Sequence, residues 1–126
     1  MRSSKYLDPN LLNQTRLEAA RYVKEDGLAK IPYLGRDSTV RFIEFLYRMG
    51  AQSVEISKLD RTAYDSNFIM ELYVRVSDQD KTRDILNLIF KALPFAVEET
   101  ATRVFRLEWT SKHSHPIVVK HGFPKF

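Results

Sequence analysis

The stretch FIMELYVRV, residues 68–76, alternates between two kinds of side chain. One set is entirely apolar and consists of Phe68, Met70, Leu72, Val74 and Val76. The other set mixes apolar, aromatic and charged residues and consists of Ile69, Glu71, Tyr73 and Arg75. Because successive side chains of a β-strand point to opposite faces, this pattern predicts a strand with its apolar face on the core. We call the opposite face, which carries the mixed set, the outer face.

The segments on either side of this strand show the same two-residue period. Upstream, Val54 and Ile56 alternate with polar residues, and the polar stretch 60–67 predicts a hairpin between the two strands. Downstream, residues 95–109 are extended again and place their apolar side chains on one face. The alternation breaks from 98 to 103, which predicts a bulge or a turn that splits this segment into two short strands.

Two amphipathic helices are predicted between these strands from capping residues and a helical spacing of apolar residues. The first is capped by Asp37 or Ser38 and runs to Met49. The second follows a capping box formed by Ser77 and Asp80. Both helices have a wide apolar face, which indicates that they pack on the sheet.

The N-terminal third of the chain predicts weaker elements. Asp8 and the proline after it are a favourable helix entry, so we expect a helix over 8–26 that stops at Gly27. Residues 28–36 show only a short apolar alternation, and Pro32 lacks the N–H that a strand ladder needs. This segment is therefore an edge strand at best.

From residue 28 to residue 110 the predicted elements follow the order β-α-β-β-α-β. That is the ferredoxin-like order, an antiparallel sheet with two helices on one face, here with an extra N-terminal helix. The competing interpretation drops the weak first strand and leaves a three-stranded sheet with three helices. Both interpretations predict an α+β fold.

The length of 126 residues predicts one domain with one core. We expect an N-terminal arm over 1–7, a single α+β domain over 8–110 with its body at 28–110, and a basic C-terminal tail over 111–126. The net charge is +4, but residues 37–110 hold ten basic and twelve acidic side chains. The positive charge therefore lies at the two ends, and contact with nucleic acid would involve them.

The composition also bears on the compartment and on several classes of chemistry. The chain has no cysteine, which excludes disulfide scaffolds, thiolate zinc sites and cysteine nucleophiles and suits a reducing compartment. Its first residues lack the apolar core of a signal peptide, and no apolar stretch approaches the roughly 18 residues of a membrane span. We therefore expect a cytoplasmic protein that does not associate with a membrane.

Motifs for enzyme chemistry are weak. The four glycines are isolated, so no phosphate-binding loop is predicted, and no serine has the spacing of a nucleophile elbow. The three histidines, His113, His115 and His121, have a spacing that could hold zinc. Their segment lacks the carboxylates that orient such ligands, so a solvated tail is favoured and no metal or cofactor is predicted.

The outer face carries the functional prediction. It mixes apolar and aromatic residues with arginine, which is typical of an interface. The candidate interface residues are Ile69, Tyr73, Arg75, Val104 and Arg106. The sequence therefore predicts a non-enzymatic binding domain that forms a homodimer, or binds another protein, through this face.

Two alternatives concern the same face. Tyr73 could stack a base of single-stranded RNA while the basic termini contact phosphates, although the RNA-binding signature around such an aromatic residue is missing. Glu55, Glu71 and Glu108 also share this face with the arginines. Ordinary cross-strand charge pairing is favoured for them over a catalytic acid.

Overall fold

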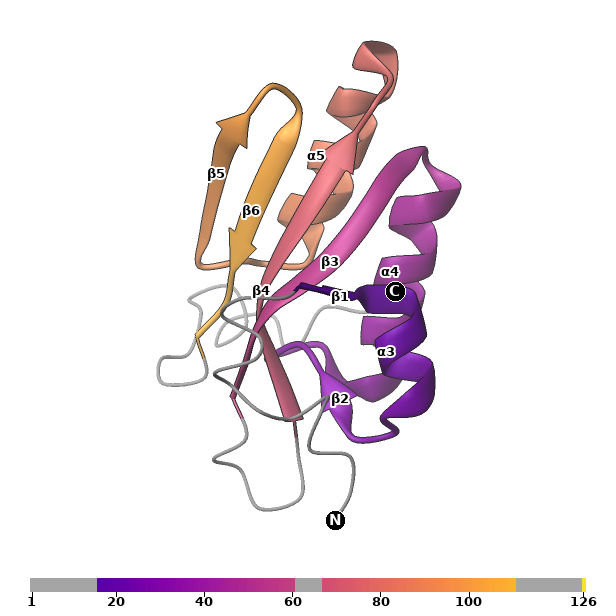
Figure 1. Cartoon of the computed structure of the whole chain (residues 1–126), viewed down its shortest axis with the longest axis vertical. Helices are drawn as coiled ribbons and strands as arrows, with labels where there is room; N and C mark the ends of the chain where they lie inside the picture. Colours follow the sequence, from indigo (N-terminus) through magenta and orange to yellow (C-terminus); the bar gives the residue numbers. More distant parts are fainter. Residues whose placement is uncertain (1–15, 61–66, 111–125) are drawn as a thin grey trace.

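Strand β4, Asn67–Val76, lies at the centre of a six-stranded sheet in the computed structural model, which describes residues 16–60, 67–110 and 126. It pairs antiparallel with β3, Ala51–Asp60, on one edge and with β6, Val104–Glu108, on the other. Beyond these lie β1, Leu17–Glu18, next to β3, and β5, Ala96–Ala101, next to β6. The order across the sheet is thus β1-β3-β4-β6-β5 (Figure 1).

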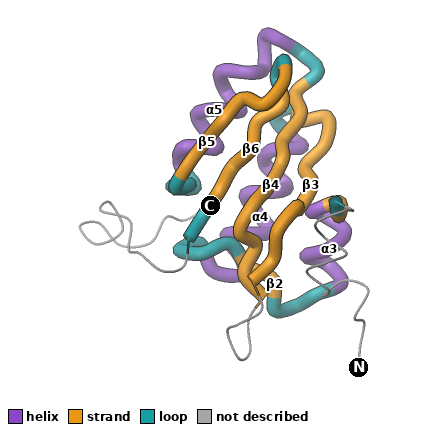
Figure 2. Tube along the Cα trace, turned by 60° about the vertical axis from the view of Figure 1, so that its left-hand side comes forward, coloured by secondary structure: helices purple, strands orange, loops and turns teal. Residues whose placement is uncertain are grey.

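Three α-helices cover one face of this sheet in the described part of the chain: α3, Ala19–Glu25, α4, Gly35–Arg48, and α5, Thr82–Lys91. Figure 2 shows the strands in front and the helices behind them. The buried residues of the helices and of the inner sheet face form a single apolar cluster. The fold is therefore α+β, as the alternation and the helical spacing predicted.

The weak segment near Ile31 forms a two-residue strand, β2, Ala29–Lys30. It pairs in parallel with Asn67 and Phe68 of β4. Because β3 pairs with β4 at Phe68 along one edge, β2 lies along the other edge, which β6 occupies from Glu71 onward. The elements follow the predicted order along the chain, but β6 takes most of the edge that a longer first strand would fill. The ferredoxin-like sheet order is therefore not confirmed, and the competing three-stranded sheet is wrong.

The split in the last extended segment is confirmed. β5 and β6 are joined by a turn at residues 102–103, where Arg103 has a φ of 55°. The Glu99 carboxylate accepts a hydrogen bond from the Arg103 backbone N–H at 2.8 Å and holds the turn. At the far side of β5 the residues from Glu98 to Ala101 are exposed, so this strand is an open edge among the described strands.

The helix predicted over 8–26 is wrong for residues 17 and 18, which form β1. The helix begins only at Ala19, because the Glu18 carboxylate accepts hydrogen bonds from the backbone N–H groups of Ala20 and Arg21 and caps it there. The helix ends at Glu25 and not at Gly27, which has no left-handed conformation. Residues 8–15 of the prediction, and the arm over 1–7, lie outside the described residues.

The starts of the other two helices also differ from the prediction. α4 begins at Gly35, two residues before Asp37. The capping box of Ser77 and Asp80 is replaced by Asp78, whose side chain accepts a hydrogen bond from the Asp80 backbone N–H at 2.9 Å and opens a short 3-10 turn before α5. Of the tail predicted over 111–126, only Phe126 is described.

The strict alternation predicted for 68–76 breaks once. Leu59 pairs with Ile69 and Lys58 pairs with Glu71, so Met70 is an extra residue in β4, and Ser57 is an extra residue in β3. A bulge of this kind shifts the side chains before it to the other face. Leu72, Val74 and Val76 therefore point into the core as predicted, while Ile69 is also buried in the core and Phe68 and Met70 are only half-buried.

Candidate functional site

The outer face brings together four of the five predicted interface residues. Tyr73 pairs with Arg106, and Arg75 pairs with Val104, in adjacent cross-strand positions of β4 and β6. Paired residues of an antiparallel ladder point to the same face, so these side chains form one patch. Ile69 does not belong to it, because the bulge turns its side chain into the core, where it is 0% exposed.

Arg106 is the centre of a hydrogen-bonded cluster on this face. Its Nη1 donates to Glu71 Oε2 and to Glu108 Oε1, each at 2.9 Å, and its Nε donates to Glu98 Oε1 at 3.1 Å. These carboxylates come from β4, β6 and β5, so the cluster joins three strands. The Ser57 hydroxyl from β3 donates to the other oxygen of Glu71 at 2.6 Å. We call Arg106 with Glu71, Glu98 and Glu108 the acidic cluster, since three carboxylates share one guanidinium.

The contacts within the acidic cluster favour the ionised forms of Glu71 and Arg106. Burial alone would raise the pKa of Glu71, whose side chain is 13% exposed, but the hydrogen bonds from Ser57 and Arg106 outweigh burial and lower the pKa. The hydrogen bonds to Glu108, Glu71 and Glu98 raise the pKa of Arg106. A general acid needs a carboxyl that is protonated near neutral pH, whereas the lowered pKa of Glu71 favours its ionised form. The cross-strand charge pairing predicted for this face is therefore confirmed.

Tyr73 is covered by a residue that sequence reasoning missed. The Arg16 guanidinium lies 3.6 Å from the centroid of the Tyr73 ring, and its Nη1 is 3.8 Å from Glu55 Oε1. Arg16 escaped prediction because its segment was assigned to a continuous helix and not to a strand beside β3. The Tyr73 ring is thus already in contact with a cation on one side.

The other two patch residues differ in exposure. Val104 is 8% exposed although it lies on the outer face. The neighbouring Arg75 is exposed, and its side chain has no hydrogen bond or ion pair with any part of the chain that the structure describes. The patch therefore combines a buried apolar residue, a cation-covered aromatic ring and an arginine that has no ionic partner among the described residues.

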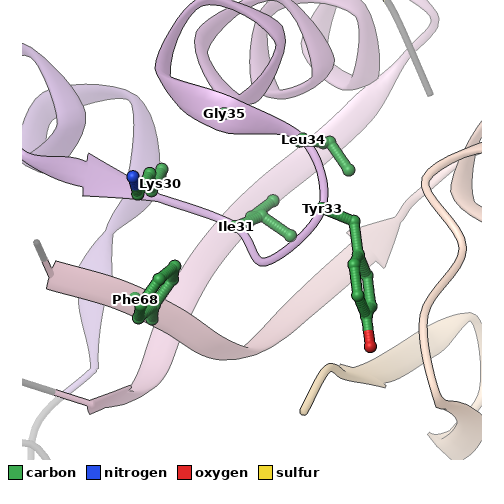
Figure 3. Close-up of a pocket in the computed structure, with 6 residues that line it drawn as sticks. All are labelled: Lys30, Ile31, Tyr33, Leu34, Gly35 and Phe68. Atoms are coloured by element: carbon green, nitrogen blue, oxygen red, sulfur yellow. The ribbon is translucent and has the colours of Figure 1, made fainter. Parts of the chain in front are cut away.

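A second candidate lies beside β2, a segment for which the sequence predicted no site residue. Residues 31–34 form a type II turn in which the Leu34 N–H donates to the Ile31 carbonyl at 3.1 Å, Pro32 holds the second position and Tyr33 holds the third with a φ of 76°. Next to this turn lies a cavity of about 270 Å³. Its described lining residues are Lys30, Ile31, Tyr33, Leu34, Gly35 and Phe68 (Figure 3).

The remaining sequence candidates fall elsewhere. His113, His115 and His121 lie outside the described residues. Within residues 16–60, 67–110 and 126, no group of three or more histidine and carboxylate side chains is arranged to hold a metal ion. In the same residues, no helix has both the length and the apolar character needed to cross a membrane.

Comparison of the chain with protein-family models, with curated proteins and with solved structures gives no significant match.

Proposed function

We propose that the protein is a non-enzymatic binding domain that self-associates through its outer sheet face. The observation that carries the proposal is the separation of charge on that face. The acidic cluster holds three carboxylates around Arg106, while Arg75 is exposed and has no partner in the described structure. One face therefore presents a surplus of negative charge and an unneutralised positive charge side by side.

A dimer with two-fold symmetry would bring the positive charge of this face in one copy onto the negative charge of the other. In an isologous dimer the same patch meets itself, so residue i of one copy contacts residue j of the other and the reverse. Arg75 of each copy would then contact the acidic cluster of the other. Tyr73, which pairs with Arg106 in the ladder and is half-buried, would supply the aromatic centre that interfaces favour.

Sedimentation velocity over a range of protein concentrations tests the proposal. The wild-type chain should sediment as a dimer at high concentration and dissociate on dilution and at high salt, because the contact is partly ionic. Arg75→Glu should abolish the dimer, since it places a carboxylate against carboxylates. Lys24→Glu, the same charge change at an exposed position of α3, should leave the dimer intact.

A charge exchange makes the test specific. Glu98 is the most exposed member of the acidic cluster, with 59% of its side chain accessible, so Glu98→Arg should be tolerated by the fold. Mixing Arg75→Glu with Glu98→Arg should restore a heterodimer through the interface half that now pairs glutamate with arginine. A wild-type chain that stays monomeric at every concentration, or an Arg75→Glu variant that still dimerises, would contradict the proposal.

Binding of single-stranded RNA is the second candidate, and the position of Tyr73 on the central strand favours it. The acidic cluster beside Tyr73 repels phosphate, which places this function behind self-association. Fluorescence anisotropy with a labelled single-stranded RNA at two salt concentrations separates the candidates. Salt-sensitive binding that is weakened by Tyr73→Ala would support RNA recognition, and no binding at low salt would leave the face to protein.

A further inference from the structure

We propose that the cavity beside the Pro32–Tyr33 turn is a binding site for a small aromatic carboxylate. This site is separate from the self-association patch and involves none of its residues. The proposal rests on the size of the cavity, on the aromatic and apolar character of its walls, on the charge of Lys30 and on the backbone conformation of Tyr33.

The volume of the cavity accommodates a ligand of one or two rings. It is about 270 Å³, and the cavity is open to solvent. A cavity of about 150 Å³ in an apolar protein interior is enough to bind benzene. Sites for drug-sized molecules begin at about 300 Å³, so the cavity suits a molecule between these limits.

The walls of the cavity favour an aromatic ring. Figure 3 shows Ile31 in the middle, with Phe68 and Lys30 on one side of it and Tyr33 on the other. Ile31 and Leu34 are buried and lie beneath the cavity, while Phe68 and Tyr33 are half-buried and offer their rings to a ligand. A planar ring in the cavity would contact these two rings, and aromatic pairs gain from edge-to-face or offset contacts.

Lys30 gives the cavity its charge. It is the charged member of the described lining, and its Nζ lies 5.4 Å from the centroid of the Phe68 ring. Within the described residues Lys30 has no carboxylate partner. Asp60 pairs with Phe68 from the opposite strand but is not part of the described lining. A ligand carboxylate would supply the counter-charge at the edge of the aromatic wall.

The backbone of Tyr33 is strained where it borders the cavity. Its φ of 76° lies in the left-handed region, and the third position of a type II turn normally requires glycine or asparagine. Strained backbone of this kind collects at ligand clamps, where the rest of the structure holds it in place. The side chain projects away from the turn, and its hydroxyl has no hydrogen-bond partner in the described structure. The turn therefore holds the Tyr33 side chain among the lining residues of the cavity.

Titration of the ¹⁵N-labelled full chain with 2-naphthoate, followed by amide chemical shifts, tests the proposal. The shifts should saturate and should concentrate at residues 30–35 and 68. The neutral isostere 2-naphthamide should bind about tenfold more weakly, since it loses the charge-assisted contact with Lys30. Thermal unfolding of every variant, without ligand, checks that the fold is intact.

Three variants locate the interaction. Lys30→Met keeps the apolar stem and should remove the preference for 2-naphthoate over 2-naphthamide. Tyr33→Asn introduces a residue that tolerates positive φ and should lower the affinity for both ligands, because it removes one aromatic ring from the cavity. Lys24→Met, an exposed lysine of α3, is the matched control and should change neither affinity.

Any of three results overturns the proposal. The first is no saturable binding of 2-naphthoate, and the second is saturable binding with shifts that lie away from the cavity. The third is equal affinity for the carboxylate and the amide in the wild-type chain, which would show that Lys30 does not recognise the charge.

Discussion

Replacing Arg106 by methionine removes the cation that three carboxylates share and keeps most of the apolar length of the side chain. Glu71 is the least exposed of the three, and loss of its hydrogen bond to a charged donor costs about 1.5–3 kcal/mol. Glu98 and Glu108 are 59% and 36% exposed, and ion pairs of that kind contribute about 0–1 kcal/mol each. We therefore expect Arg106→Met to lower the free energy of unfolding by about 1.5–5 kcal/mol at neutral pH.

The pH dependence of this loss identifies its cause. In the wild-type chain the pKa of Glu71 is lowered, because the hydrogen bonds from Ser57 and Arg106 outweigh the effect of burial. A lowered pKa stabilises the fold above the unfolded value of about 4.3, and the stabilisation is lost as the pH falls through the folded value. In the variant the pKa of Glu71 rises, since burial stays and Arg106 is gone. The difference between the two proteins should therefore shrink as the pH falls from neutral to about 4.

Urea unfolding followed by circular dichroism at several pH values measures both quantities. Two protein concentrations separate the fold from self-association. Arg75→Met is the matched control, because Arg75 is exposed on the same face without a partner in the described structure, and it should change stability by less than about 0.5 kcal/mol. A loss below about 1 kcal/mol for Arg106→Met, or a loss that does not change with pH, would refute the reasoning.

Two further substitutions probe the contacts that hold the helices to the sheet. Tyr47→Phe removes a hydroxyl that donates to Glu18 and accepts the Val54 N–H at 3.0 Å, so urea unfolding should show a loss of about 1–2 kcal/mol. Burial raises the pKa of Tyr47 to about 12, so a tyrosine that titrates near pH 12 in the wild-type chain should be missing from an alkaline absorbance titration of this variant. Burial would raise the pKa of Asp26, but hydrogen bonds from Leu28, Tyr22 and Asn67 lower it. Asp26→Asn should therefore cost about 1–2 kcal/mol at neutral pH, and the cost should shrink below about pH 4; a cost that is independent of pH would contradict the assigned charge.

The sequence predicted the parts of the fold that depend on local side-chain patterns. The apolar run Leu72, Val74 and Val76 reaches the core as expected, and the broken alternation between 98 and 103 marks a real turn. The pairing of arginine with glutamate on the outer face followed from the same alternation. These features need only the two-residue period of a strand and the charge of neighbouring side chains.

The features that depend on distant contacts were missed. The extra residues Ser57 and Met70 have no distinctive side chains, so the bulge that buries Ile69 leaves no mark in the sequence. The cavity was missed because it needs the parallel pairing of β2 with β4, a contact between segments far apart in the chain. It also needs a positive φ at Tyr33, a residue type that rarely adopts one.

The edge of β5 that no described strand covers has a consequence for how the sheet could grow. An unpaired strand edge offers its backbone N–H and C=O groups to any other strand, which is how fibrils begin. Glu98 and Glu99 follow one another on β5, so each face of an added copy of this strand would bring like charges together. The negative charge of these two side chains thus protects this edge against polymerisation. Repulsion between like charges, and not a covering element, is what the described structure offers against growth of the sheet from this end.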